Sequence, residues 1–220
     1  HQFYAWAART GLVGVNPVED LPVPRRGRSL PRPIGEDDLM AALAAAPDRI
    51  RLWIVLAAWA GLRAKEVALL RRENILLSAA PAPLLLVAAD ATKGIRERAV
   101  PLAPFAVTEI TAAGLPLAGW CFTRGDGGRG PNTPARVSQV AAAHFRACGI
   151  AATLHMCRHR FGTQAYAVRR DLREVQELLG HADVRSTQIY ADWDRASAAA
   201  TVAAIPVPPP LRVVGGSQAV

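Results

Sequence analysis

Six polar residues, far apart along the chain, are of the types that act on phosphate esters. They are Arg63, Lys93, His155, Arg158, His181 and Tyr190. Guanidinium groups match phosphate oxygens bidentately and stabilise the negative charge that develops when phosphorus is attacked. Imidazole and amine groups exchange protons, and a phenol forms covalent intermediates once a base accepts its proton. Brought together, the six side chains would suit phosphoryl transfer.

The spacing of His155 and Arg158 is the most local part of this pattern. Residues at i and i+3 share one face of a helix, so a helix here would present both cations on the same side. Taken alone, such a pair is more often a solvated basic face. The pair indicates a catalytic site only in combination with other segments of the chain. In order, these are Ala60–Val67, Thr92–Gly94, Leu178–Asp183 and Thr187–Tyr190.

Helices separated by a small sheet must position these residues. Hydrophobic spacing and capping signals predict helices over residues 36–46, 48–59, 66–70, 104–113, 134–148, 155–169 and 172–179. Strands are predicted at 75–77, 84–88 and 98–100, with Lys93 in a turn before the last of them. Asp183 predicts a short helix reaching Tyr190, and a further helix is expected over 194–204. The expected fold class is α+β, mainly helical with a small antiparallel sheet.

The composition narrows the class of protein. The 220 residues are 51% hydrophobic, enough for a substantial core, and carry a formal net charge of +8, which favours a polyanionic partner. The longest apolar run, residues 52–62, is shorter than the ~20 residues of a membrane-spanning helix. The three cysteines, at 121, 148 and 157, match no disulfide framework or zinc knuckle, so we expect reduced thiols in a cytoplasmic protein.

In order and spacing, the six residues resemble the signature of the tyrosine site-specific recombinases, the phage integrase family. The family pattern is Arg, Lys, His-x-x-Arg, His or Trp, and Tyr, and the resemblance runs from about Gly35 to Tyr190. It implies that Arg63 and Arg158 clamp the phosphate and that Tyr190 is the nucleophile. The list of implied catalytic residues is Arg63, Lys93, His155, Arg158, His181 and Tyr190. Met156-Cys157 departs from the Asp-Leu of many relatives, at positions with no chemical role.

The resemblance also implies a mechanism. Tyr190 would form a 3′-phosphotyrosyl bond with DNA, with His155 as the proton acceptor. Glu66 would support the active-site helix. Nine residues separate His181 from Tyr190, about half a turn out of phase on one helix, so a break between them would let both face one phosphate. Because the ester retains the bond energy, no cofactor and no metal are expected.

Lys93 is notable for a reason independent of the family. Of the 26 Lys and Arg residues, only Lys65 and Lys93 are lysines. Arginine is effectively never deprotonated in proteins, whereas a lysine among cations can donate its proton. Lys93 is therefore a candidate general acid that protonates the leaving 5′-oxygen, although chance retention of one lysine is the ordinary alternative.

The resemblance implies domains and partners as well. We expect the end of an N-terminal core-binding domain at 1–15, a basic Pro/Arg-rich linker at 16–34, a catalytic domain at 35–204 and a C-terminal tail at 205–220. The expected partner is double-stranded DNA carrying recombination sites, bound by a homotetramer on two sites, with a monomer possible without DNA. The Ala-rich segment after Tyr190 docks either on a neighbouring protomer or on its own domain.

Three alternatives compete with this interpretation. A type IB topoisomerase uses a similar phosphotyrosine site without pairing two DNA sites, and a non-enzymatic DNA-binding protein would account for the charge but not for the ordered residues. In a metal hydrolase, His155, His159, His181 and Asp183 would be plausible zinc ligands. Met156 stands where that motif needs its glutamate base, and the surrounding arginines would repel a dication.

Overall fold

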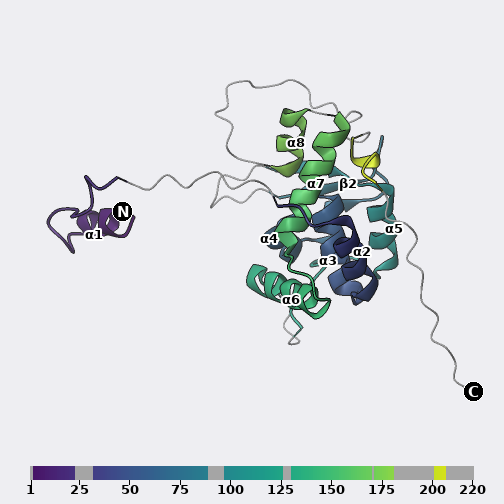
Figure 1. The fold of residues 1–220 in the computed structure, drawn as a ribbon, viewed down its shortest axis with the longest axis horizontal. Helices are drawn as coiled ribbons and strands as arrows, with labels where there is room; N and C mark the ends of the chain where they lie inside the picture. Colours follow the sequence, from purple (N-terminus) through teal and green to yellow (C-terminus); the bar gives the residue numbers. More distant parts are fainter. Residues whose placement is uncertain are drawn as a thin grey trace, which may run out of the picture. The chain divides into compact units, whose positions relative to one another are not determined.

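The chain divides into an N-terminal unit, residues 1–30, and a larger unit, residues 31–220. The computed structural model describes residues 2–22, 32–88, 97–125, 130–169, 171–180 and 201–206. The N-terminal unit contains helix α1 (Gln2–Arg9), on which the ring of Phe3 contacts those of Tyr4 and Trp6. All other elements belong to the larger unit (Figure 1).

Helix α3 (Asp48–Trp59) forms the centre of the larger unit. Every side chain from Leu52 to Trp59 is buried, as expected for a helix that is apolar on all sides. Around it pack α2 (Glu36–Ala45), α5 (Pro104–Ala112) and α7 (Leu154–Arg169). Because α7 packs against this buried helix, the position of α3 determines where the side chains of α7 lie.

A three-stranded antiparallel sheet interrupts the helices. Its strands are β1 (Ile75–Leu76), β2 (Leu84–Val87) and β3 (Arg98–Pro101), with β2 in the middle. Before β1 lies a 3₁₀ turn, Arg72–Asn74, which the sequence did not predict. The predicted α+β fold, mainly helical with a small antiparallel sheet, is confirmed.

The turn after α3 depends on Gly61. This residue has φ +64°, and a Cβ atom added there would lie 2.6 Å from Cδ1 of the Phe161 ring. Both the left-handed backbone and the close ring exclude other residues. The turn buries Leu62 and leads into α4 (Ala64–Ala68). Helix α4 begins two residues before the predicted start because the Glu66 carboxylate accepts a hydrogen bond from the Arg63 amide at 2.7 Å, which caps the helix.

Helices α6 and α8 lie at opposite ends of α7 (Figure 1). In α6 (Pro134–Ala147) the Thr133 hydroxyl caps the first turn by accepting from the Arg136 amide. In α8 (Leu172–Leu179) the Asp171 carboxylate caps the first turn, and Gly180 ends the helix with φ +61°. These helices match the predicted ones within one residue at each end.

A buried arginine fastens α7 to its neighbours. Arg160 donates from Nε and Nη2 to the Glu36 carboxylate, at 2.7 and 2.9 Å, and from Nη1 to the Ala58 carbonyl at 3.2 Å. Its guanidinium also stacks on the Trp59 ring, 4.6 Å from the centroid. Helix α7 is thereby held against both α2 and α3.

Residues 201–206 pack on their own domain. Val202 and Ile205 are buried, and the Trp59 indole Nε1 donates to the Pro206 carbonyl at 3.3 Å. The Thr201 hydroxyl donates to the Glu174 carboxylate on α8 at 2.7 Å. In the single chain, the described part of the segment after Tyr190 thus contacts its own domain. Residues 181–200, including the predicted short helix to Tyr190, lie outside the described residues.

In the part of the chain that the structure describes, no helix has the length and apolar character needed to cross a bilayer.

Candidate active site

Three of the six predicted residues come together where α4 and α7 begin. Arg63 precedes the first residue of α4, and His155 and Arg158 lie in the first turns of α7. Both arginines contact the same carboxylate, that of Glu66, and both act electrostatically on His155. The other three predicted residues, Lys93, His181 and Tyr190, lie outside the described residues.

Glu66 is the anion around which the arginines gather. Its carboxylate is 3.0 Å from Arg63 Nη1, 2.9 Å from Arg98 Nη1 and 3.6 Å from Arg158 Nη1. Burial alone would raise the pKa of Glu66, but the hydrogen bonds and charge of Arg98, the Arg63 amide and the charge of Arg158 outweigh it and lower the pKa. The carboxylate therefore stays ionised and keeps three guanidiniums close together.

The site keeps an excess of positive charge because three arginines face one carboxylate. Arg63 is partly open to solvent, with 29% of its side chain exposed, whereas the Arg158 side chain is 2% exposed. Burial and the charge of Arg63 lower the pKa of Arg158 to about 9, so the group remains charged at neutral pH. Such a cluster of fixed cations suits a ligand with two or more anionic oxygens, such as a phosphate.

Backbone carbonyls orient Arg158. Its Nη1 donates to the Gly61 carbonyl, at the turn after α3, and its Nη2 donates to the Leu179 carbonyl, at the end of α8. The guanidinium therefore joins three elements, α3, α7 and α8. A side chain held in this way loses little further freedom when it binds an anion, which is the preorganisation that electrostatic catalysis needs.

His155 lies at the edge of this cluster and is exposed. Its ring packs edge-on against the ring of His159, one turn along α7, with centroids 4.3 Å apart. Desolvation, followed by the charges of Arg158 and Arg63, lowers the pKa of His155. The imidazole is therefore neutral at physiological pH and available as a proton acceptor.

This electrostatic setting can be tested directly. In the DNA-free protein, the NMR titration of the His155 ring should have its midpoint below about pH 6.5, the ordinary value for histidine. Arg63→Gln should move the midpoint upward because a charge that disfavours the imidazolium is removed. Because the neutral imidazole is the form expected to accept a proton, activity should rise with pH through this lowered midpoint. Arg136→Gln, an exposed arginine on α6, is the control. A wild-type midpoint above 6.5 would contradict this account.

Arg98 is a member of the site that the sequence analysis missed. It is the first residue of β3, and its guanidinium binds Glu66 through both Nη atoms, at 2.9 Å each. The signal for it was available, since alternation along the strand puts Arg98 on the same face as the buried Val100. A charged residue at a buried strand position requires a carboxylate partner.

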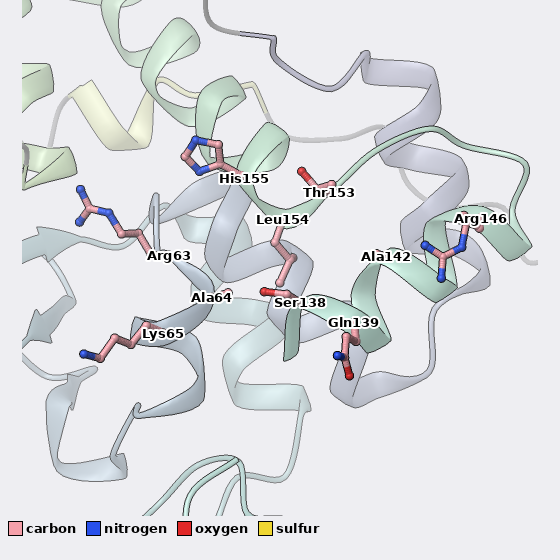
Figure 2. Close-up of a pocket in the computed structure, with 10 residues that line it drawn as sticks. All are labelled: Arg63, Ala64, Lys65, Ser138, Gln139, Ala142, Arg146, Thr153, Leu154 and His155. Atoms are coloured by element: carbon pink, nitrogen blue, oxygen red, sulfur yellow. The ribbon is translucent and has the colours of Figure 1, made fainter. Parts of the chain in front are cut away.

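A cavity of about 640 Å³ opens beside Arg63 and His155 (Figure 2). Figure 2 shows Lys65 on one wall, from α4, and Ser138 and Gln139 on another, from α6. The cavity is lined by Arg63, Ala64, Lys65, Ser138, Gln139, Ala142, Arg146, Thr153, Leu154 and His155. Its polar residues and its three cationic side chains, Arg63, Lys65 and Arg146, suit a polyanion that extends away from the arginine cluster.

Other chemistries have little support in the described residues. Within those ranges no three His, Cys, Asp or Glu side chains converge as metal ligands would. Two of the four residues considered for zinc, His181 and Asp183, lie outside the described part of the chain. Burial raises the pKa of the Cys157 thiol to about 12, so this cysteine, next to Arg158 in sequence, is not a thiolate nucleophile.

Comparison with known proteins places this chain among related sequences. The profile of the phage integrase family matches residues 34–196. The tyrosine recombinase XerC of Xylella fastidiosa (strain M23) is 33% identical over 208 residues, covering 87% of this chain and 66% of its own length. This chain thus spans just under two thirds of that relative.

Solved structures show the same fold. The integrase of mycobacterium phage Brujita superposes with a TM-score of 0.67 at 28% identity, over 93% of this chain and 68% of its own. A lambda integrase tetramer bound to a Holliday junction superposes with a TM-score of 0.58 at 19% identity, over 88% of this chain and 57% of its own. The second likeness is one of fold alone.

Proposed function

Because the chain belongs to the phage integrase family of tyrosine recombinases, we propose that it cuts and rejoins DNA at specific sites through a 3′-phosphotyrosyl bond to Tyr190. The observation that carries this proposal is the cluster of Arg63 and Arg158 on one carboxylate, with His155 beside it. The match to the family and the likeness to XerC do not favour a metal hydrolase or a DNA-binding protein without enzymatic activity.

The proposed reaction proceeds in two balanced steps. The Tyr190 oxygen forms a bond to phosphorus as the bond to the 5′-oxygen breaks, and the phenolic proton passes to His155. Arg63 and Arg158 donate to the nonbridging oxygens, where negative charge develops. His181 is proposed to donate to the same phosphate. In the second step the 5′-hydroxyl of the partner strand attacks the phosphotyrosine and releases Tyr190, so the number of ester bonds is conserved.

Lys93 is proposed as the general acid for the leaving 5′-oxygen. Lys93→Ala should cleave a normal phosphodiester about 10²- to 10⁴-fold more slowly than the wild type, the usual contribution of general acid catalysis. A 5′-phosphorothiolate substrate should recover most of this loss, because a thiolate leaves without protonation. Single-turnover cleavage of the two substrates measures both effects. The matched control is Lys65→Ala, the other lysine of the chain, which should show no selective recovery. Equal rates of Lys93→Ala on both substrates would rule out this role.

The proposed partner is double-stranded DNA with recombination sites, bound by four protomers on two sites. The net charge of +8 and the polar cavity beside Arg63 and His155 support a DNA partner. We propose that the strand flanking the scissile phosphate runs along this cavity, between α4 and α6. The XerC and XerD relatives come from bacteria, so the proposed location is the bacterial cytoplasm, where the DNA is.

The test is to incubate the full-length protein with nicked suicide DNA that carries candidate attachment sites. A protein–DNA adduct that survives denaturation, mapped to Tyr190 by mass spectrometry of the digested complex, would support the proposal. An adduct accompanied by relaxation of supercoils without recombination between two sites would favour a type IB topoisomerase. If no adduct forms even on a verified site, the proposal fails, and a DNA-binding protein without enzymatic activity becomes the better interpretation.

A further inference from the structure

Three arginines hold three consecutive carbonyls at the end of α8, those of its last two residues and that of Gly180, which follows it. Arg98 Nε donates to the Leu178 carbonyl at 2.9 Å, Arg158 Nη2 donates to that of Leu179, and Arg63 Nη2 reaches that of Gly180 at 3.4 Å. The final carbonyls of a helix lack partners within the helix and carry the negative end of its dipole. The arginines satisfy these groups and fix the point where α8 ends.

Two of these arginines would also bind the phosphate in the proposed reaction. Arg63 and Arg158 would donate to its oxygens, so a bound phosphate and the carbonyls of α8 would both accept from the N–H groups of these arginines. The 3.4 Å contact of Arg63 is the longest of the three and the easiest to exchange. During the reaction the N–H groups of these two arginines would therefore be shared between the phosphate and the end of α8.

Arg98 has no such competing task. All three of its nitrogens donate within the protein, two to Glu66 and one to Leu178, and 7% of its side chain is exposed. The fit around it is tight, because a Cβ atom on Gly180 would lie 2.8 Å from Arg98 Nη1. Glycine at 180 thus allows the guanidinium to pass directly beneath the end of the helix.

We propose that Arg98 is a positioning residue for strand cleavage, which holds the end of α8 against Glu66 while Arg63 and Arg158 bind the phosphate. This inference rests on the proposed function. The residue that follows Gly180 is His181, and Tyr190 lies nine residues further on. The end of α8 is therefore the point from which the chain continues into residues 181–190. Displacing it by about 1 Å can cost about 10²-fold in rate, since nucleophilic attack requires close alignment.

The experiment compares Arg98→Met and Arg98→Lys with the wild type in the full-length protein. Methionine fills a similar volume without donors, and lysine retains the charge but cannot bridge Glu66 and Leu178 as a fork does. Single-turnover cleavage at saturating DNA gives the rate constant, and a binding titration gives the Kd. Arg173→Met, on the exposed face of α8, is the matched control.

Arg98→Met should lower the cleavage rate constant by about 30-fold or more and change the Kd by less than about 3-fold, because the residue acts on geometry and not on DNA contact. Arg98→Lys should fall between the methionine variant and the wild type. Thermal denaturation shows whether each variant is folded. If Arg98→Met is unfolded, the cleavage rate of Arg98→Lys tests the inference instead. A folded variant that cleaves within about twofold of the wild type, or that loses DNA affinity and rate equally, would overturn the inference. A wild type without any adduct would instead refute the proposed function.

Discussion

Replacing Tyr190 with phenylalanine is expected to abolish the covalent protein–DNA adduct and leave DNA binding nearly unchanged. The variant lacks only the phenolic oxygen, so no bond to phosphorus can form, whereas the aromatic ring is retained. The arginine cluster on Glu66 is untouched, so the affinity for the phosphate should persist. The measurement is adduct formation on suicide DNA, together with a gel-shift titration of the same DNA.

Tyr166→Phe is the matched control for this substitution. Tyr166 lies on α7, eight residues after Arg158, with 46% of its surface exposed, and none of the site contacts involves it. Its variant should form the adduct at the wild-type rate. If the adduct persists in the Tyr190 variant but disappears in the Tyr166 variant, the nucleophile is Tyr166 and our proposal is wrong.

Replacing Arg158 with lysine is expected to slow strand cleavage by about 10²- to 10³-fold, the usual cost of removing one group that stabilises developing charge. The ammonium keeps the positive charge but lacks the planar fork that donates to the Gly61 and Leu179 carbonyls. Single-turnover cleavage measures the effect, and the Kd for DNA should rise much less than the rate falls. This split distinguishes stabilisation of the transition state from ordinary binding.

Stability must be measured alongside this rate. Arg158 is 2% exposed, and lysine at the same place leaves at least one buried carbonyl without a donor, at a cost of about 1–3 kcal/mol in the free energy of unfolding. Arg173→Lys, on the exposed face of α8, controls for the substitution itself. If Arg158→Lys is folded at the assay temperature and cleaves DNA within about threefold of the wild type, Arg158 does not bind the transition state as proposed.

Local signals predicted most of the secondary structure. Helix α3 starts at Asp48 and contains an unbroken apolar run from Leu52 onward, and α8 begins after a capping aspartate and ends at a glycine. The prediction failed where the local pattern was weak. Helix α4 starts earlier than expected because a side chain three residues ahead caps it, and β1 is reduced to two residues that pair with β2.

The amino-acid sequence by itself determined which chemical groups are present and in what order. The pair of His155 and Arg158 on one helix face follows from its spacing, and the order of the six residues was enough to identify the family. Neither inference required contacts between distant parts of the chain.

Only the tertiary structure decided how the charges are balanced and held. Glu66 and Arg98 are 32 positions apart, and Arg98 and Leu178 are 80 apart, so no local pattern could pair them. Burial makes these pairings obligatory, because a charge removed from water must find a partner. Packing of α8 against both α7 and β3, together with the contacts of these elements with Glu66 on α4, brings one carboxylate among three arginines, and this packing turns an ordered list of residues into a site.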